Sequence, residues 1–438
     1  MNHICDAGAR WALLTAHICL SIPLWYVNAK AQVADRTPAT SGTLTLREAR
    51  EAARRASPEV LGAREAVAAA TARERQARAL PNPTLSYQRE VTSEGGQANA
   101  QHIVSIDQPL ELGGQRGARS VAARLRREAA VARLSAAEMQ LDYDVTRAYA
   151  LAMAADRRAT LAETAADAFN RARTASETRL TAGDVSGYAN RRLRLEAARY
   201  GALLAEAQLT RRTARLTLAS LIAANVDSLR PLNAVLDDSV VANVVTVTAD
   251  SLQSLAFRNR AELRAAILNA EAAAAEARLA SRERVPVPVL TAGMKNEEVV
   301  GGDELNGFVA GISLPLPLWD RRGGAVDAAN ADARRRTTEA DAVRRRVARE
   351  VAEALDGLRA IVEQLAVLAP HLGAESERAL RAAQVAYAEG EISLVEWLDA
   401  VRAYQEAEST FTSLRAESLI RRAGLDRAIG IAILGEGR

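Results

Sequence analysis

Few residues in this chain are of the types that do chemistry. Both cysteines, Cys5 and Cys19, lie near its start, and of the four histidines only His102 and His371 lie beyond residue 17. No histidine, cysteine or carboxylate spacing resembles a metal site, and no phosphate-binding loop or dinucleotide fingerprint is present. The glycine pairs 113–114 and 323–324 stand between strand and helix patterns, where they serve as junctions. The sequence therefore predicts no catalytic residue, no cofactor and no metal site, and it disfavours an enzyme.

Three carboxylates share a different setting, because each lies beside a glycine that interrupts a helical pattern. Asp184 follows Gly183, while Glu389 and Glu391 flank Gly390. One interpretation is a pair of solvated turns. The other is an aperture: if several copies meet there, these three side chains, here called the tip acids, form a ring, and such rings attract cations in pores. Both interpretations depend on the elements that carry the glycines.

Composition points to long helices. Aromatic residues make up only 4% of the chain, although compact cores rely on them for buried area. Alanine, leucine, arginine and glutamate take their place, which is typical of coiled coils. The 57 basic residues are balanced by 54 acidic ones and are interleaved with them. A nucleic-acid partner is therefore not expected, since it would need a one-sided basic surface.

Residues 1–31 have the pattern of a signal peptide. An apolar run from Trp11 to Val27 follows Arg10 and ends near Ala29-Lys30-Ala31, an A-x-A cleavage pattern. The run is too short and too interrupted for a good transmembrane helix. We expect export, cleavage after residue 31 and a mature chain without cysteine. A lipid on Cys19 is not expected, because bulky Ile18 precedes it.

The rest of the sequence consists of one unit that occurs twice in tandem. Residues 80–85 reappear at 285–290, shifted by 205, and Pro109-Leu110 reappears at Pro315-Leu316, shifted by 206. Residues 181–186 correspond to 388–393, shifted by 207. Landmarks that keep their order and spacing indicate an internal repeat. We expect a first repeat over 32–230, a connector over 231–248 whose valine-rich end adds a short strand or cap, and a second repeat over 249–438.

Each repeat predicts the same elements. A helix comes first, and in the first copy Thr45 and Glu48 form a capping-box pattern. Prolines at 81 and 83 end that helix, and alternating residues then predict a β-hairpin at about 84–107, matched at about 287–315. Arg89 and Glu90 are expected at a rim, and residues 295–298 in an exterior loop. Trp319 is either an interfacial anchor or a packing residue.

A very long helix follows each hairpin. Residues 118–178 contain neither proline nor glycine, which allows a helix on the order of 90 Å. In the second copy, apolar residues from Val343 to Leu365 recur at spacings of four and three. A glycine turn near 183, or near 390, then reverses the chain into a second helix. The predicted protomer is thus mainly α with a small β part, with two β-hairpins and two long α-hairpins.

Four strands cannot close a barrel, because the smallest transmembrane barrels need about eight. Open edges are not tolerated in a bilayer, so several copies must join. Three copies would supply twelve strands for an outer-membrane β-barrel and enough helices for a periplasmic α-helical barrel. Closure alone would also permit a dimer with eight strands.

An alternative is a structural or adhesive envelope protein on a coiled-coil stalk, but a stalk does not require the strands.

The repeat, Pro81-Asn82-Pro83 before the first hairpin, and residues 108–116 (QPLELGGQR) after it resemble the TolC-type outer-membrane efflux family. Among its branches the sequence is most similar to the one that serves cobalt–zinc–cadmium exporters. The resemblance implies a homotrimeric channel in the outer membrane of a Gram-negative bacterium, with most of the chain in the periplasm. It also implies a periplasmic adaptor, an inner-membrane resistance-nodulation-division pump and contact with outer-membrane lipid.

The resemblance further implies that the α-hairpin tips contact the adaptor. By position these residues are Arg179, Gly183, Asp184, Val185, Ser186, Gly390, Glu391, Ile392 and Ser393. The sequence does not name the cargo, for which heavy-metal cations and organic compounds are both candidates.

Overall fold

The computed structural model describes residues 42–94, 97–233, 248–298 and 304–432. The first copy of the repeat contains four helices, two strands and a 3-10 turn among these residues. They are α1 (Leu46–Ala56), α2 (Pro58–Arg78), β1 (Thr84–Glu94), β2 (Gln97–Pro109), α3 (Gln115–Ala182), α4 (Gly187–Leu221) and η1 (Val226–Ser228). The expected signal peptide, residues 1–31, lies outside the described residues.

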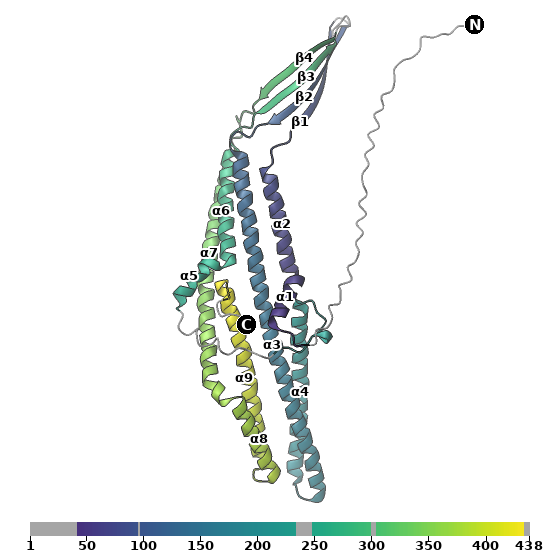
Figure 1. Ribbon diagram of the computed structural model, residues 1–438, viewed down its shortest axis with the longest axis vertical. Helices are drawn as coiled ribbons and strands as arrows, with labels where there is room; N and C mark the ends of the chain where they lie inside the picture. Colours follow the sequence, from purple (N-terminus) through teal and green to yellow (C-terminus); the bar gives the residue numbers. More distant parts are fainter. Residues whose placement is uncertain (1–41, 95–96, 234–247, 299–303, 433–438) are drawn as a thin grey trace, which may run out of the picture. The chain divides into compact units, whose positions relative to one another are not determined.

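The second copy has the same order with one additional break. Its elements are α5 (Ala249–Asn259), α6 (Ala261–Arg282), β3 (Val289–Glu298), β4 (Glu304–Ser313), α7 (Gly323–Leu368), η3 (Ala369–His371), α8 (Ala374–Glu389) and α9 (Leu394–Ile429). The strands lie beyond one end of the helices, and both α-hairpin turns lie at the opposite end (Figure 1). The predicted fold class, mainly α with two β-hairpins and long α-hairpins, is confirmed for the protomer.

Local sequence explains where the first helices begin. The Glu48 N–H donates to the Thr45 hydroxyl at 3.2 Å, and the Thr45 N–H donates to the Glu48 carboxylate at 2.8 Å, so the predicted capping box is confirmed. The first helix does not continue unbroken to residue 80. Ser57 ends α1 in an extended conformation and caps α2, whose first residue is Pro58, as suits a residue without an N–H.

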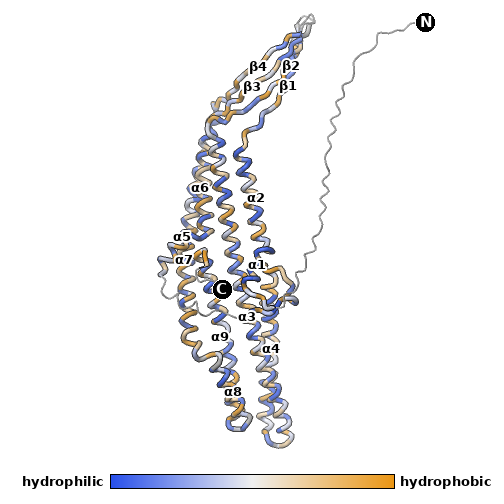
Figure 2. The backbone as a smooth tube through the Cα atoms, viewed as in Figure 1, coloured by the Kyte–Doolittle hydropathy of each residue, from blue (hydrophilic) through white to orange (hydrophobic). Residues whose placement is uncertain are grey.

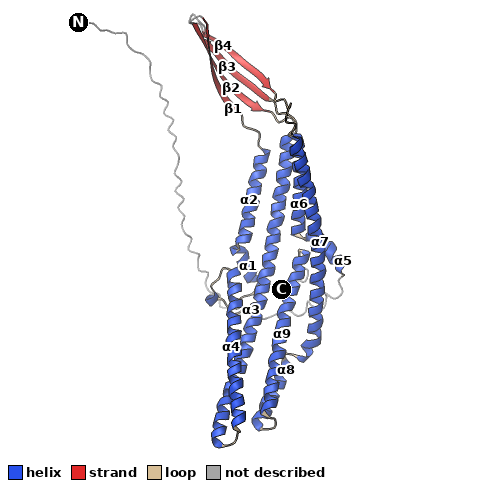
Figure 3. Ribbon diagram, turned by 180° about the vertical axis from the view of Figure 1, so that it is seen from behind, coloured by secondary structure: helices blue, strands red, loops and turns tan. Residues whose placement is uncertain are grey.

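The long helix of the first copy is confirmed. Helix α3 spans 68 residues, which at 1.5 Å per residue is about 100 Å. It packs against α2 and α6 toward the sheet and against α4 and α9 toward the turns (Figure 3). Helix α4 packs mainly along α3 and is therefore an edge helix of the chain.

The corresponding helix of the second copy is interrupted. Pro370 lies in η3, and Gly373 takes a φ of 73°, so α7 ends and α8 begins in a new direction. Glu408 of α9, only 3% exposed, accepts hydrogen bonds from the Gly373 N–H at 3.1 Å and the Ser376 hydroxyl at 2.9 Å. This carboxylate satisfies the new helix N-terminus, where negative charge is favourable.

The four strands form one antiparallel sheet in the order β1-β2-β3-β4. The pairing of β2 with β3 joins the two copies, with Val104 opposite Met294. Hydrophobic and hydrophilic residues alternate along the strands (Figure 2), as expected when the two faces of a sheet meet different environments. The expectation of an exterior loop at residues 295–298 is wrong, because all four belong to β3 and pair with β2.

Buried side chains form separate clusters along the helices. One joins α1, α2, α3 and α4 around Val60, Val145 and Leu218, and its counterpart joins α5, α6, α7 and α9 around Val351 and Leu355. The stripe predicted on α7 faces this second cluster. Of the predicted connector, Leu232 forms a single parallel bridge with Leu44, and the valine-rich part lies outside the described residues.

Candidate docking tips and channel surfaces

The first α-hairpin tip is a tight glycine turn. Gly183 has a φ of 85°, in the left-handed region that residues with a side chain rarely adopt. Its N–H donates to the Leu180 carbonyl at 3.1 Å, and the Asp184 N–H donates to the Arg179 carbonyl at 2.9 Å. These two bonds form a Schellman motif, which satisfies the last carbonyl groups of α3.

The second tip repeats the motif, shifted by 207 positions in the sequence. Gly390 has a φ of 80°, and its N–H donates to the Tyr387 carbonyl at 3.2 Å. The Glu391 N–H donates to the Ala386 carbonyl at 2.9 Å. The two glycines thus have a structural role that any tight α-hairpin requires, whatever binds to the tips.

A serine starts each returning helix. The Ser186 hydroxyl accepts a hydrogen bond from the Ala189 N–H at 3.2 Å, and the Ser393 hydroxyl accepts one from the Glu396 N–H at 3.3 Å. Glu396 completes a capping box by accepting from the Ser393 N–H at 2.7 Å, and this bond lowers the pKa of the Glu396 carboxyl. Both serine hydroxyls are therefore engaged in capping.

Most residues predicted to contact an adaptor are exposed. At the first tip these are Arg179, Gly183, Asp184 and Ser186, and at the second Gly390, Glu391 and Ser393. Val185 and Ile392 are partly buried, and Ile392 packs into the chain's own interior. All three tip acids, Asp184, Glu389 and Glu391, are exposed. Adaptor contact and a ring of acids at an aperture both stay predictions.

Aromatic side chains fix the two tips to each other. Phe169 of α3 is fully buried, stacks on Tyr200 of α4 with ring centroids 4.1 Å apart, and lies 5.2 Å from Trp397 of α9. Trp397 in turn stacks on Tyr387 of α8 at 5.1 Å. Burial raises the pKa of both tyrosine hydroxyls. We call these four rings the tip cluster.

Sequence reasoning missed the tip cluster. Its signal was available, because in a chain with so few aromatics each one marks a place where large buried area is needed. Phe169, Tyr200, Tyr387 and Trp397 all lie within a few helical turns of a tip glycine. The helix pattern alone could not show that the two hairpins meet each other at this point.

One face of the sheet carries an apolar band. The register aligns one row of large apolar side chains: Tyr87, Val104, Met294 and Phe308. Their exposed fractions run from 47 to 90% in the chain alone, so a neighbouring phase or partner must cover them. The next row toward the helices is also apolar: Leu85, Ile106, Ala292 and Ala310. In the other direction the row is polar: Arg89, His102, Asn296 and Asn306.

The opposite face of the sheet is mostly polar. Asp107 accepts hydrogen bonds from the Ser86 hydroxyl at 2.7 Å and the Thr291 hydroxyl at 2.5 Å, across three strands. Lys295 and Glu297 form an ion pair at 2.9 Å on the same face. An apolar face and a polar face alternating residue by residue is the pattern of a barrel strand between lipid and water. The rim position expected for Arg89 and Glu90 stays a prediction.

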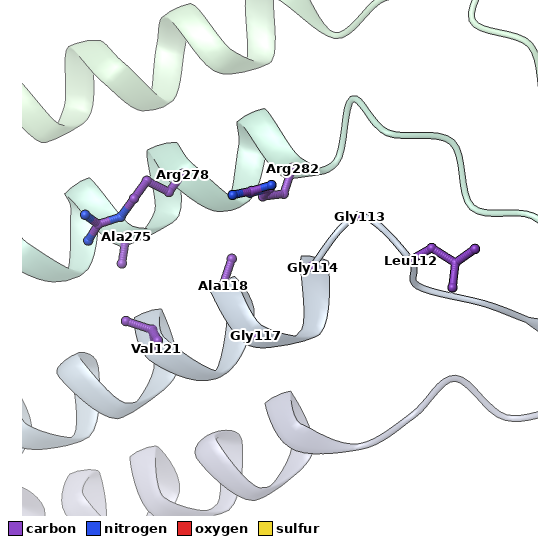
Figure 4. A pocket seen from close by; sticks show the side chains of 9 residues that line it. All are labelled: Leu112, Gly113, Gly114, Gly117, Ala118, Val121, Ala275, Arg278 and Arg282. Carbon is purple, nitrogen blue, oxygen red and sulfur yellow. The ribbon is translucent and has the colours of Figure 1, made fainter.

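A groove lies where the helices meet the sheet. Ala118 and Val121 of α3 line one side, and Arg278 and Arg282 of α6 line the other (Figure 4). Trp319, beyond β4, is 94% exposed. Its role as an interfacial anchor or a packing residue stays a prediction.

Neither a metal centre nor a spanning helix appears in the described part of the chain. Within residues 42–94, 97–233, 248–298 and 304–432, no group of three or more histidine, cysteine or acidic side chains could hold a metal ion. None of the helices described there combines the length and apolarity needed to cross a membrane.

Comparison with known proteins agrees with this geometry. Residues 252–431 match the family of outer membrane efflux proteins. The cobalt-zinc-cadmium resistance protein CzcC of Cupriavidus metallidurans is 26% identical over 359 residues, which cover 81% of this chain and 82% of that protein. The predicted resemblance to outer-membrane efflux proteins is thereby confirmed.

Solved structures show the same fold. The outer-membrane channel OprN superimposes with a TM-score of 0.71 at 19% identity, over 88% of this chain and 89% of that chain. The outer membrane protein VceC of Vibrio cholerae superimposes with a TM-score of 0.68 at 20% identity, over 88% of this chain and 96% of that chain.

Proposed function

We propose that this chain, which carries an outer membrane efflux protein domain, is the outer-membrane channel of a tripartite efflux system and conducts its cargo passively. The observation that carries the proposal is the sheet. It has four strands, an apolar face and two outer edges, β1 and β4, for which the described residues supply no partner strand. Such a sheet is stable in a bilayer only as part of a closed barrel.

Three copies would close the barrel with twelve strands. The β4 edge of one copy would pair with the β1 edge of the next, and the apolar band would face lipid all round. Two copies would give eight strands, the smallest number found in such barrels. We favour the trimer because the helices must also enclose a water-filled tube that is wide enough for cargo. Most of the chain would then lie in the periplasm, below the barrel.

The α-hairpin tips are the surface we assign to a periplasmic adaptor, which would connect the channel to an inner-membrane resistance-nodulation-division pump. The tips lie at the end of the helices opposite the sheet (Figure 1). Seven of the nine predicted contact residues are exposed. The tip cluster holds the two turns together without using those residues, so a partner would meet a preorganised surface. Preorganisation reduces the entropy lost on binding.

For the cargo we propose heavy-metal cations, on the likeness to the cobalt-zinc-cadmium resistance protein. A channel that only conducts needs no metal centre of its own, because a tight site would slow release. In the bacterium that makes this protein, deletion of its gene should increase sensitivity to cobalt, zinc or cadmium. If sensitivity to organic compounds increases instead, this cargo is wrong and the channel proposal still stands.

The direct test is the protein mass of the particle extracted from outer membranes, measured by light scattering corrected for detergent. The full chain has a mass of 46.8 kDa, and the proposal requires three times the mass of the mature chain. Reconstitution into planar bilayers should then give discrete conductance steps. A protein that stays soluble as a monomer without detergent would remove the barrel and favour the stalk.

A further inference from the structure

The groove between the helices and the sheet has a floor without side chains. Gly114 and Gly117 lie at the start of α3, and a Cβ atom added at either would meet nothing within 4 Å. Leu112 stands at the end of the groove toward the strands, and Val121 continues the floor along α3 (Figure 4). The groove encloses about 520 Å³, which is within the range of small-ligand sites. It therefore has room for a group that the chain does not supply.

One wall of the groove is basic. Arg278 and Arg282 lie one turn apart on α6, across from the glycines of α3 (Figure 4). Both are exposed, and neither guanidinium has a hydrogen-bond or ion-pair partner in the part of the chain that the structure describes. None of the described residues that line the groove is acidic. Two free guanidinium groups attract an anion, and phosphate oxygens accept paired hydrogen bonds from such groups.

The surroundings of the groove do not neutralise this charge. Two carboxylates of the junction are engaged elsewhere, because Glu111 pairs with Arg119 at 2.7 Å and Glu283 pairs with Arg322 at 2.5 Å. Helix α3 begins without a side-chain cap and without an acid in its first turn, so the positive end of its dipole stays open. Further exposed arginines without a partner among the described residues lie at this junction: Arg116, Arg284 and Arg321.

The groove lies where the apolar surface of the sheet ends. On the face of the apolar band, Leu290 pairs with Ile312 one row closer to the helices than Ala292 and Ala310. Beyond β4 the chain carries more exposed apolar side chains: Leu314, Leu316, Leu318 and Trp319. In the proposed channel, the hydrocarbon of the bilayer ends at this junction and the phosphates of its lipids lie just beyond. Tryptophan and arginine are both favoured at such a boundary.

We propose that the groove between α3 and α6 binds an anionic phospholipid from the inner leaflet of the outer membrane. Arg278 and Arg282 hold its phosphate, and Leu112 lies beside its acyl chain. The inference rests on the proposed function, because only the barrel brings the groove to the level of the headgroups. The site is complete within one chain, since α3 and α6 pack on each other and α2 and α7 flank them.

The charge of the groove also selects the headgroup. Phosphatidylethanolamine carries an ammonium group that offsets its phosphate, whereas phosphatidylglycerol has a net negative charge. Because no acid lines the groove among the described residues, an ammonium group would gain nothing there and would be repelled by the arginines. Basic pockets between helices at a membrane surface are sites of this kind for anionic headgroups.

Lipid retention by the intact particle tests the proposal. The purified channel in detergent is titrated with phosphatidylglycerol or phosphatidylethanolamine, and native mass spectrometry counts the lipids that stay bound. We expect phosphatidylglycerol to bind in preference, at one molecule per chain. The variant Arg278→Gln with Arg282→Gln should lower the affinity for phosphatidylglycerol by at least about tenfold, because each arginine near an anionic lipid contributes about fivefold.

A second variant separates a built site from general attraction by charge. Gly117→Leu keeps both arginines and fills the groove, and its side chain starts in open space within a helix, so the fold should tolerate it. It should lose phosphatidylglycerol as strongly as the arginine variant. The control is Arg345→Gln with Arg346→Gln, which removes the same charge from exposed positions about 33 Å along α7 from its first residue. This control should bind phosphatidylglycerol like the unchanged chain.

Three results would overturn the inference. They are equal loss of lipid in the control, unchanged binding in Gly117→Leu, and displacement of phosphatidylglycerol by an equal concentration of inorganic phosphate, which would assign the groove to a soluble anion. If the particle still conducts in planar bilayers, each of these leaves the proposed function standing. A chain that stays a soluble monomer without detergent removes both the lipid site and the channel.

Discussion

Replacing Phe169 by alanine should loosen both tips without unfolding the rest of the chain. Phe169 is fully buried and contacts the rings of Tyr200 and Trp397 on two other helices. Phenylalanine-to-alanine changes in cores cost about 3–5 kcal/mol, because apolar burial is lost and a cavity remains. About 1.4 kcal/mol is a factor of ten in an equilibrium constant, so local opening of the tips should increase by about two to nearly four orders of magnitude.

Hydrogen exchange followed by mass spectrometry measures this opening directly. Peptides from the ends of α3 and α8 and the starts of α4 and α9 should exchange faster in the detergent-solubilised variant. Peptides from the sheet serve as the internal reference and should not change. The matched control is Val395→Ala on α9, where the side chain is 43% exposed and the expected change is within about 0.5 kcal/mol.

The prediction fails if exchange at the tips rises by less than about threefold in Phe169→Ala, which corresponds to less than about 0.7 kcal/mol. Contacts between copies, rather than the tip cluster, would then hold the tips. If exchange does rise, the variant should also bind a periplasmic adaptor more weakly, because the binding surface is no longer preorganised.

Three further predictions concern the same region. Glu408→Leu should destabilise the start of α8 by about 1–3 kcal/mol, because the Gly373 N–H and its neighbours lose a buried acceptor, and exchange at the first turn of α8 would show it. The hydrogen bond from the Ser393 N–H lowers the pKa of the Glu396 carboxyl in the folded chain. The ionised carboxylate therefore stabilises the start of α9 fully above the pKa that Glu396 has in the unfolded chain, and this stabilisation is lost as the pH falls through the lower folded pKa. Acid should therefore lower the protection of amides at the start of α9, measured as exchange relative to the intrinsic rate at the same pH, and Glu396→Gln should remove that acid step. Neutralising all three tip acids should reduce the cation selectivity of single channels in bilayers, and unchanged selectivity would refute the aperture.

Local patterns predicted the elements well where the cause is local. The capping box at Thr45, the long helix without proline or glycine, and the paired glycine turns all follow from residues within a few positions of one another. The two antiparallel hairpins were predicted in the same way, whereas the pairing of β2 with β3, which joins them into one sheet, was not. The loop predicted at residues 295–298 is wrong, because all four residues pair with β2. In a strand whose opposite face meets water, charges are compatible with pairing, and Lys295 and Glu297 form an ion pair there.

Long-range packing could not be predicted in the same way. The first helix of each copy breaks, at Ser57 in one and at Arg260 in the other. Pro58 gives a local sign of the first break, but the second has none. Arg260 is only 4% exposed and donates to the Arg427 carbonyl at 2.8 Å and to Glu350 at 2.7 Å, so residues far along the chain hold it in place. The burial of Ile392 likewise depends on a cluster from four helices.

The two repeats differ most where α7 gives way to α8, and the difference has a chemical cause. In the first copy the corresponding part of α3 is one unbroken helix, whereas Pro370 and Gly373 interrupt the helix of the second copy. An interrupted helix exposes N–H groups that must find acceptors, and here a buried carboxylate from α9 supplies one. Because Arg157 of α3 lies 3.4 Å from the same carboxylate, the break is also tied to the continuous helix of the first copy. The start of α8 is thus held by a few polar contacts around Glu408, whereas its other end is held by the tip cluster, in which Tyr387 stacks on Trp397. Perturbation of Glu408 should therefore loosen the start of α8 more than the tips.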